Sequence, residues 1–383
     1  MNIALLGYGT VGSGAAECMA KMPMDNVRLR RVFGRRDIPA VSEILTKNID
    51  DILCDDSIDI AAEVMGGDEP AYTYVKRALS AGKNVVSANK LMLSKHYDEL
   101  IEIANEKGVT LAFSAAVGGG IPWLYNLLRT KRVDRLLSLG GVMNGTTNYI
   151  LDAMQTSDEA EFSDVLKTAQ QLGYAEADPT ADIDGLDVKA KIALTCDIAF
   201  DKMINPDDVP ALGIRYITRK DIAYFRTLRR NCRLIGRAEK IGEDIAVYVE
   251  PMLFKPTAPE YNLPGAGNMI SYNCELLGGH TFVGQGAGKE PTGSAIVQDI
   301  YDIASDRSIF KSCRCTGAAA VKCDAAEHEY YVRTAAEIDG GIIKEKLAEN
   351  TFITNKISVS KMHGIARDII ASGAEIFAAG FAD

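Results

Sequence analysis

Apolar and polar positions follow two different periods over roughly the first 115 residues. Short apolar runs predict strands, and segments with an apolar position every three or four residues predict helices. The predicted strands are Asn2–Leu6, Arg28–Phe33, Ile58–Val64, Lys83–Ser87 and Val109–Phe113. The predicted helices are Thr10–Lys21, Glu69–Ala81 and Tyr97–Lys107. Strands that alternate with helices favour a doubly wound, mostly parallel α/β sheet.

The pattern changes after about residue 125 and becomes typical of an α+β domain. A strand at Val133–Met143, helices at Glu161–Leu172 and Leu186–Phe200, and an antiparallel pair at Cys232–Ile241 and Ile245–Phe254 are predicted. The last part of the chain predicts a strand at Tyr330–Ala335, a helix at Gly341–Glu349 and a strand at Ile353–Ser358. We therefore expect three parts: 1–125 completed by a helix at about 290–310, then 126–290, then 321–383.

Charge and composition exclude several classes of protein. The 383 residues carry 42 basic and 52 acidic side chains, a formal charge of −10 that argues against a nucleic-acid binder. No basic segment precedes Ile3–Leu6, so a signal peptide is not expected. The uncharged stretch between Lys107 and Arg129 contains three consecutive glycines and Pro122, which do not suit a membrane-spanning helix.

Eight cysteines and four histidines are present. The cysteines never form a C-x-x-C pair, so a zinc site or dithiol redox motif is not indicated. Reduced thiols in a cytoplasmic protein are the simplest interpretation.

The glycines Gly7, Gly9 and Gly12 follow the first predicted strand and open the first predicted helix at Thr10 and Val11. The first glycine permits a tight turn, the second a close approach to pyrophosphate, and the third close packing of helix on strand. The N–H groups at the start of the helix can bind the anion. This context predicts a dinucleotide-binding domain over residues 1–125.

Two arginines follow the second predicted strand, at the place where an NAD site has an acidic residue. Arg35 and Arg36 precede the first acid, Asp37. A guanidinium matches the geometry of a phosphate, so NADP is favoured over NAD. The alternative is a pair of solvated surface arginines.

Five further segments combine glycine, small polar residues and isolated charges. They are Glu63–Gly67, Ser87–Lys90, Ala116–Pro122, Asn144–Tyr149 and Gly173–Lys191. The last places Glu176, Asp178, Asp182, Asp184 and Asp187 within twelve positions. Asp187 and Lys191 are four residues apart on one helix face, as a positioned pair would be.

Together these segments resemble homoserine dehydrogenase, from residue 1 to about residue 310. The resemblance implies NAD(P)-dependent interconversion of L-homoserine and L-aspartate 4-semialdehyde, a step toward threonine, methionine and isoleucine. It also implies a homodimer or homotetramer with a small-molecule substrate. Homoserine is a zwitterion, so carboxylates for its ammonium and N–H donors for its carboxylate suit this substrate.

The resemblance also implies roles for individual residues. Lys191 donates the proton to the aldehyde oxygen, Asp187 orients Lys191, and Lys90 is a second active-site lysine near the nicotinamide. Substrate contacts are expected from Glu176, Asp182, Asp187, Gly145 and Thr146. Cofactor contacts are expected from Gly7, Gly9, Thr10, Val11, Gly12, Arg35, Arg36, Gly66, Lys90, Gly173, Gly286 and Gly288.

The chain departs from the family at two places. Ser114 stands where the family commonly has a glutamate that helps to hold a monovalent cation. The candidate sodium ligands that remain are the carbonyls of Val117, Gly119 and Ile121. Because a hydroxyl is a weaker and uncharged ligand, loss of sodium binding is favoured, with retention through these carbonyls as the alternative. The last part resembles the opening of an ACT regulatory domain but is short, which leaves threonine control unsupported and dimer contacts as the alternative.

Two other functions remain open from the sequence. One is a related dehydrogenase with a different amino- or hydroxy-acid substrate, which Ser114 motivates. The other is a non-catalytic NADP-binding regulator. Retention of Lys90, Glu176, Asp187 and Lys191 weighs against a regulator, because a sensor does not need that full set.

Overall fold

The computed structural model describes residues 1–242 and 244–382, which divide into two compact units. The first unit comprises Met1–Asp134, Leu194–Asn205 and Gly284–Ala318. The second comprises Arg135–Ala193, Pro206–Val283 and Ala319–Asp383. Each unit is therefore assembled from segments that are distant in sequence, and the boundaries expected from the sequence remain predictions.

The first unit contains a six-stranded sheet in the order β3-β2-β1-β4-β5-β6. Its strands are β1 (Asn2–Leu6), β2 (Arg28–Phe33), β3 (Leu45–Thr46), β4 (Ile60–Glu63), β5 (Asn84–Ser87) and β6 (Leu111–Ala112). All of its pairings are parallel, which confirms the predicted doubly wound sheet. The strands β1 and β4 are buried along nearly their whole length, as parallel strands covered on both faces must be.

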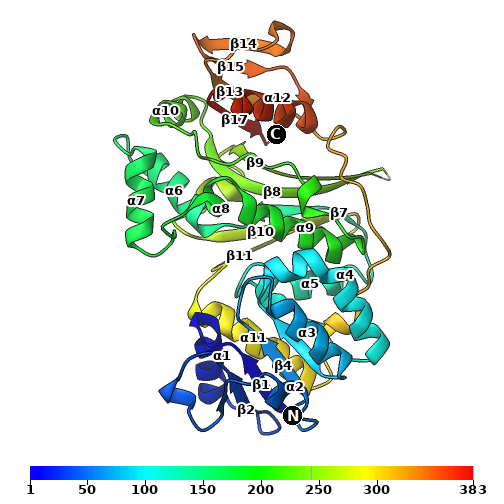
Figure 1. The fold of residues 1–383 in the computed structure, drawn as a ribbon. Helices are drawn as coiled ribbons and strands as arrows, with labels where there is room; N and C mark the ends of the chain where they lie inside the picture. The colour runs from blue at the N-terminus through cyan, green and yellow to red at the C-terminus, as the bar shows by residue number, and fades with distance from the viewer. Residues whose placement is uncertain (243, 383) are drawn as a thin grey trace. The chain divides into compact units, whose positions relative to one another are not determined.

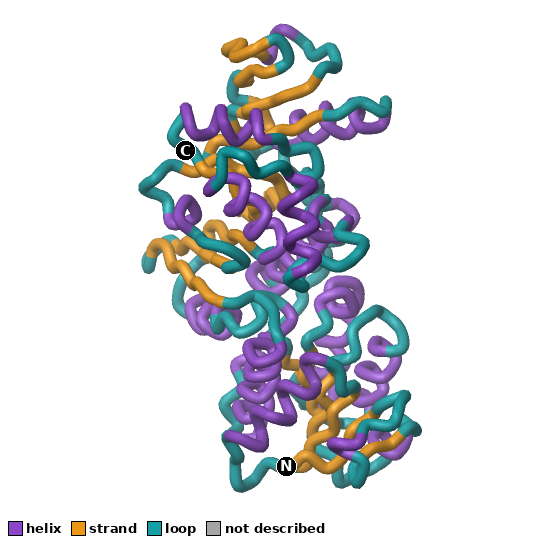
Figure 2. Tube along the Cα trace, turned by 90° about the vertical axis from the view of Figure 1, so that its left-hand side faces the viewer, coloured by secondary structure: helices purple, strands orange, loops and turns teal. Residues whose placement is uncertain are grey.

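Helices flank this sheet, as the lower part of Figure 2 shows. They are α1 (Thr10–Lys21), α2 (Asp50–Leu53), α3 (Ala71–Ser80), α4 (Lys90–Lys107), α5 (Trp123–Thr130) and α11 (Lys289–Ala304). Helix α11, which lies far along the chain, packs against α1, and α3 packs against α4 (Figure 1). Residues 284–318, which include α11, thus belong to the first unit.

The contact between α1 and α11 depends on glycine. A Cβ on Gly293 would lie 2.6 Å from the backbone carbon of Gly14, and a Cβ on Gly14 would lie 2.3 Å from the Lys289 carbonyl oxygen. Neither distance is tolerated by a real side chain, because the opposing atoms belong to backbone. The missing side chains therefore set how closely the two helices approach.

The second unit contains a nine-stranded sheet in the order β11-β10-β7-β8-β9-β17-β13-β15-β14. Its first strands are β7 (Leu136–Val142), β8 (Asn231–Ile241), β9 (Asp244–Phe254), β10 (Asn268–Cys274) and β11 (Gly278–Gly284). The strands from the end of the chain are β13 (Tyr330–Thr334), β14 (Ile343–Ala348), β15 (Thr351–Thr354) and β17 (Ile376–Phe381). The predicted pair β8 and β9 is antiparallel over eleven positions. A separate two-stranded sheet joins β12 (Glu327–His328) to β16 (Ile357–Ser358).

The second unit also contains helices, of which α9 continues into the first unit. They are α6 (Gly145–Thr156), α7 (Phe162–Gln171), α8 (Thr180–Ile183), α9 (Leu186–Phe200), α10 (Arg219–Thr227) and α12 (Val359–Ala371). Helix α10 begins with a capping box in which the Thr218 and Asp221 side chains each bond the other's backbone N–H.

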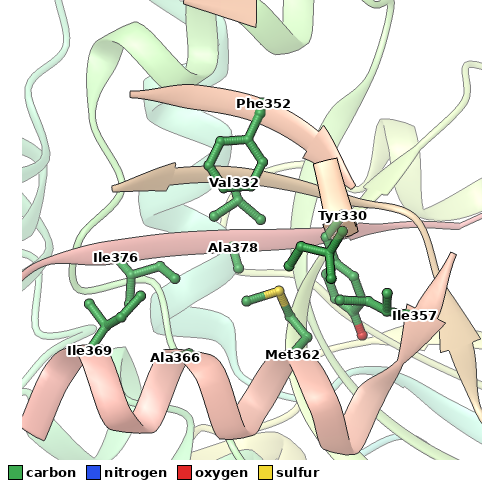
Figure 3. Packing of buried hydrophobic residues seen from close by; sticks show 10 residues of the cluster. Tyr330, Val332, Phe352, Ile357, Met362, Ala366, Ile369, Ile376 and Ala378 are labelled. Atoms are coloured by element: carbon green, nitrogen blue, oxygen red, sulfur yellow. The ribbon is translucent and has the colours of Figure 1, made fainter. Parts of the chain in front are cut away.

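The end of the chain is an integral part of the second unit. Strand β17 pairs in parallel with β9 and antiparallel with β13, so it lies inside the nine-stranded sheet. Figure 3 shows Met362, Ala366 and Ile369 of α12 facing apolar side chains of these strands. Beneath them the buried Glu250 carboxylate accepts hydrogen bonds from Tyr330 Oη at 3.1 Å and bonds to His363 Nε2 at 2.9 Å.

The predicted helix at Gly341–Glu349 is wrong, because Ile343–Ala348 form strand β14. Its Lys, Glu, Leu and Ala residues favour a helix locally, but pairing with β15 overrides that preference. Residues 335–342, between β13 and β14, contain a 3-10 turn at Gly340–Ile342 and no α-helix. The chain therefore lacks the first helix of an ACT domain, and the ACT-like assignment remains a prediction.

None of the helices within residues 1–242 and 244–382 combines the length and apolar character needed to cross a bilayer. All eight cysteines have free thiols, in agreement with the expected reduced state.

We expect Gly293→Ala to lower the unfolding temperature, because its methyl group would collide with the α1 backbone. Overpacking of this kind costs about 1–3 kcal/mol. Gly364→Ala on α12 is the matched control, since a Cβ there meets no atom within 4 Å. Calorimetry should show the control unchanged or slightly more stable. An equal effect of both substitutions would contradict the proposed close contact.

Candidate active site

The glycine turn lies at the carboxyl edge of the six-stranded sheet, where β1 is flanked by β2 and β4. Doubly wound folds bind ligands where the strand order reverses in this way. Gly7 has a φ of +113°, and its N–H donates to the Phe33 carbonyl at 3.1 Å. A Cβ on Gly12 would lie 2.4 Å from the Gly7 carbonyl oxygen, whereas one on Gly9 would meet nothing. The turn is thus tightly packed between Gly7 and Gly12 and open at Gly9, as pyrophosphate binding requires.

Strands β4 and β5 end in a shared network of buried hydrogen bonds. Glu63 ends β4 and is fully buried, and Ser87 ends β5 directly beside it. Burial raises the pKa of the Glu63 carboxyl, and hydrogen bonds from Ser87, the Met65 and Gly66 backbones and Asn89 oppose that rise. Gly66 has a φ of +73° in the turn after β4, and Lys90 is the first residue of α4.

Arg35 and Arg36 lie exposed just beyond the carboxyl end of β2. Because β3 pairs in parallel with β2, the residue after β3 lies at the same edge. That residue is Lys47, which forms an ion pair with Asp37 at 2.6 Å. Lys47 and Asp37 line a hollow of about 710 Å³ together with Ile38, Pro39, Ser42, Leu45 and Thr46. The sequence prediction missed Lys47, because only the β2–β3 pairing brings it to this edge.

Two glycine loops lie against one another in the first unit. A Cβ on Gly119 would be 2.6 Å from the Gly286 carbonyl carbon, and the Gly120 N–H donates to the Gln285 carbonyl at 3.2 Å. Gly288 then caps α11 with a φ of +125°. The structure therefore places the predicted Gly286 and Gly288 loop in the same unit as the glycine turn.

Ser114, which stands where the family commonly has a glutamate, is bonded to a buried carboxylate. The Ser114 hydroxyl donates to Asp299 Oδ1 at 2.7 Å, and its backbone N–H donates to Oδ2 at 2.9 Å. Two of the predicted carbonyl ligands each accept a hydrogen bond from Trp123, whose indole donates to Val117 at 2.8 Å and whose backbone N–H donates to Ile121 at 2.9 Å. Burial raises the pKa of Asp299 to about 7, so this carboxyl is readily protonated. No metal-binding group of three or more His, Cys, Asp or Glu residues occurs in the described part of the chain.

In the second unit, Asn144 is the centre of a polar cluster at the start of α6. Its Oδ1 accepts the Thr147 N–H at 2.8 Å and caps the helix. Its Nδ2 donates to Asp182 Oδ1 at 2.6 Å and to Asp187 Oδ2 at 2.9 Å. One amide therefore holds two carboxylates from α8 and α9 together beside the first turn of α6.

Lys191 completes this cluster from one turn along α9. Its Nζ donates to Asp187 Oδ2 at 2.7 Å and to the Met143 carbonyl at 2.7 Å. The side chains of Lys191 and Asp187 are only 10% and 9% exposed. This ion pair is therefore largely shielded from water.

The remaining predicted substrate residues are distributed around the cluster. Gly145 begins α6, where a Cβ would lie 2.7 Å from the Ala266 carbonyl oxygen. The Thr146 hydroxyl donates to the Tyr174 carbonyl at 2.5 Å, next to Gly173, whose φ is +78°. These contacts tie the turn that contains Gly173 to the start of α6.

The five carboxylates of the acidic segment do not act together. Asp182 and Asp187 meet at Asn144, as described above. Asp184 instead forms two hydrogen bonds of 2.7 Å with Arg215, and Asp178 accepts the Thr180 N–H. Glu176 is exposed, with its backbone carbonyl bonded to Gln170. The sequence prediction missed the role of Asn144, although its place directly before a helix marked it as a cap.

Comparison with known proteins agrees with this geometry. Residues 7–114 match the model for the NAD-binding domain of homoserine dehydrogenase. Residues 122–301 match the model for homoserine dehydrogenase itself. The two matches cover both the glycine turn and the cluster around Lys191.

Curated relatives extend the likeness along most of the chain. A homoserine dehydrogenase of Synechocystis sp. is 39% identical over 317 residues, which span 79% of this chain and 73% of the relative. One from Mycobacterium bovis is 33% identical and spans 94% of this chain and 86% of the relative.

A crystal structure of a homoserine dehydrogenase from Thiobacillus denitrificans superposes with a TM-score of 0.87 at 30% identity. The superposition covers 100% of this chain and 98% of that one. These findings favour homoserine dehydrogenase over the two alternatives, which are a related dehydrogenase with a different substrate and a non-catalytic regulator. By its sequence, its parallel nucleotide-binding sheet and its relatives, the chain belongs to the homoserine dehydrogenase family of oxidoreductases.

Proposed function

We propose that the chain interconverts L-homoserine and L-aspartate 4-semialdehyde with Lys191 as the acid/base catalyst. The observation that carries this proposal is the shielded pair of Lys191 and Asp187, 2.7 Å apart. A lysine ammonium can donate a proton to the aldehyde oxygen, and the amine can take it back from the alcohol. When bound, the nicotinamide supplies or accepts the hydride.

The other groups of the cluster suit the zwitterionic part of the substrate. Asp182 and Asp187 supply the carboxylates that the substrate ammonium requires, and Asn144 fixes their separation. The backbone N–H groups at the start of α6, around Gly145 and Thr146, are suited to the substrate carboxylate. Glu176 is exposed on the neighbouring loop, from which its flexible side chain can close on a bound amino acid.

Lys191→Ala should reduce kcat by about 10²–10⁴-fold, because the proton donor is lost. NADPH binding should stay within about twofold of the wild type, because this lysine belongs to the second unit. Steady-state rates with homoserine and a fluorescence titration of NADPH measure the two effects separately.

Lys189→Ala on the same helix is the matched control, and it should keep nearly full activity. Circular dichroism of both variants shows that α9 is retained. Near-normal turnover by Lys191→Ala would contradict the assignment of Lys191 as the proton donor.

We further propose that NADP is preferred over NAD, with Arg35 and Arg36 contacting the 2′-phosphate. Lys47 supports this proposal, since it adds a third cation at the same edge of the sheet. Charge-assisted hydrogen bonds to phosphate contribute about 1.5–3 kcal/mol each.

The double variant Arg35→Ala, Arg36→Ala should therefore weaken NADPH binding by about tenfold or more and NADH binding far less. Arg30→Ala serves as the control, because this exposed arginine lies earlier on β2. Isothermal titration with each cofactor gives the comparison. Equal losses for NADPH and NADH would argue that these arginines do not contact the phosphate.

We also propose that the chain forms a homodimer, with a homotetramer as the alternative, through the β11 edge of the second unit. Strand β11 ends the nine-stranded sheet, and Val283, Leu276 and Leu277 beside it are 61%, 78% and 54% exposed. An apolar sheet edge of this kind is suited to another chain. Light scattering should give twice the chain mass of 41.4 kDa, whereas a monomer at micromolar concentration would refute the proposal.

A further inference from the structure

We propose that Glu63 is a positioning residue, whose carboxylate holds the two segments that carry Gly66 and Lys90 in place for the cofactor. This inference rests on the proposed function, because it assumes that the cofactor binds at the carboxyl edge of the six-stranded sheet. It assigns a role to a buried acid that the proton transfer at Lys191 does not use.

The Glu63 carboxylate collects four hydrogen bonds from uncharged groups. Oε1 accepts the Met65 N–H at 2.8 Å, the Gly66 N–H at 3.3 Å and the Asn89 amide at 3.4 Å. Oε2 accepts the Ser87 hydroxyl at 2.6 Å. The first two bonds shape the turn after β4, and the other two reach across to the segment after β5.

Asn89 carries this arrangement on to Lys90. Its Nδ2 also donates to the Gly67 carbonyl at 2.6 Å, and its Oδ1 accepts the Met92 N–H at 3.2 Å as the cap of α4. The Ser87 hydroxyl in turn accepts the Asn89 backbone N–H at 3.0 Å. The first turn of α4, which begins at Lys90, is therefore fixed relative to the Gly66–Gly67 turn both through the Glu63 carboxylate and directly by Asn89.

The network also adjoins the glycine turn. Leu6 at the end of β1 pairs with Glu63 in the sheet, and a Cβ on Gly7 would lie 3.1 Å from the Val64 carbonyl oxygen. Glu63 thus lies between the turn that receives the pyrophosphate and the lysine expected near the nicotinamide. Burying a carboxylate is costly, so the benefit of Glu63 lies in the positions that its hydrogen bonds fix rather than in packing.

The test compares Glu63→Ala with Glu63→Gln in the full-length enzyme. Alanine leaves all four donors without an acceptor, whereas glutamine keeps Oε1 for three of them and can donate to the Ser87 hydroxyl. We expect Glu63→Ala to weaken NADPH binding and to lower kcat, each by about tenfold or more, with the KM for homoserine within about threefold. Glu63→Gln should restore both to within about threefold of the wild type.

Two further variants distinguish a loss of positioning by Glu63 from a loss of folding. Glu99→Ala removes a carboxylate of the same unit that bonds Lys76 and Tyr72 on the surface, and it should leave NADPH binding unchanged. Ser87→Ala removes one bond to Glu63 and one to Asn89, and it should weaken NADPH binding severalfold. It tests the same network if Glu63→Ala does not fold.

The outcomes distinguish this inference from the proposed function. If the wild type neither binds NADPH nor oxidises homoserine, the proposed function fails. If the wild type does both while folded Glu63→Ala or Ser87→Ala matches it, the positioning role is overturned. Folded Glu63→Gln as impaired as the alanine variant would also overturn it, because the charge and not the hydrogen bonds would then matter.

Discussion

The polar cluster of the second unit depends on giving one lysine amino group its hydrogen-bond partners where water scarcely reaches it. Lys191 achieves this with a carboxylate one helical turn away at Asp187 and a backbone carbonyl at Met143. Two nearby acids repel each other, and Asn144 offsets part of that repulsion by donating one hydrogen bond to each. The same side chain caps α6, so the geometry of the acids and the start of the helix are set together.

Much of this could be read from local patterns, because each depends on neighbours in sequence. The glycine turn, the parallel sheet and the four-residue spacing of Asp187 and Lys191 are of that kind. The features that the sequence predicted wrongly or missed depend on pairing between strands that are distant in sequence. Ile343–Ala348 became a strand because β15 lies beside it, and Lys47 reaches the arginines because β3 pairs with β2. Of the acidic segment, sequence proximity alone did not show that Asp178 and Asp184 bind elsewhere.

The small number of histidines agrees with proton transfer by Lys191. Of the four, His363 and His328 lie in the second unit near the buried Glu250 carboxylate, at 2.9 and 3.8 Å. There they link α12 and β12 to β9, and they are not part of the cluster around Lys191. His96 bonds to Asp68 on the surface of the first unit. The buried acids of the two units are thus met by different groups: neutral donors at Glu63, histidine at Glu250 and lysine at Asp187.

The place of β17 has a consequence for biosynthesis of the protein. A chain is made from its N-terminus, and the parts already made begin to fold before the rest has appeared. Here residues 376–381 lie between β9 and β13 in the sheet, so each of these strands lacks its partner on that side until those residues have been translated. The first unit likewise waits for α11. Until residues 376–381 have emerged from the ribosome, β9 and β13 each expose one unpaired sheet edge.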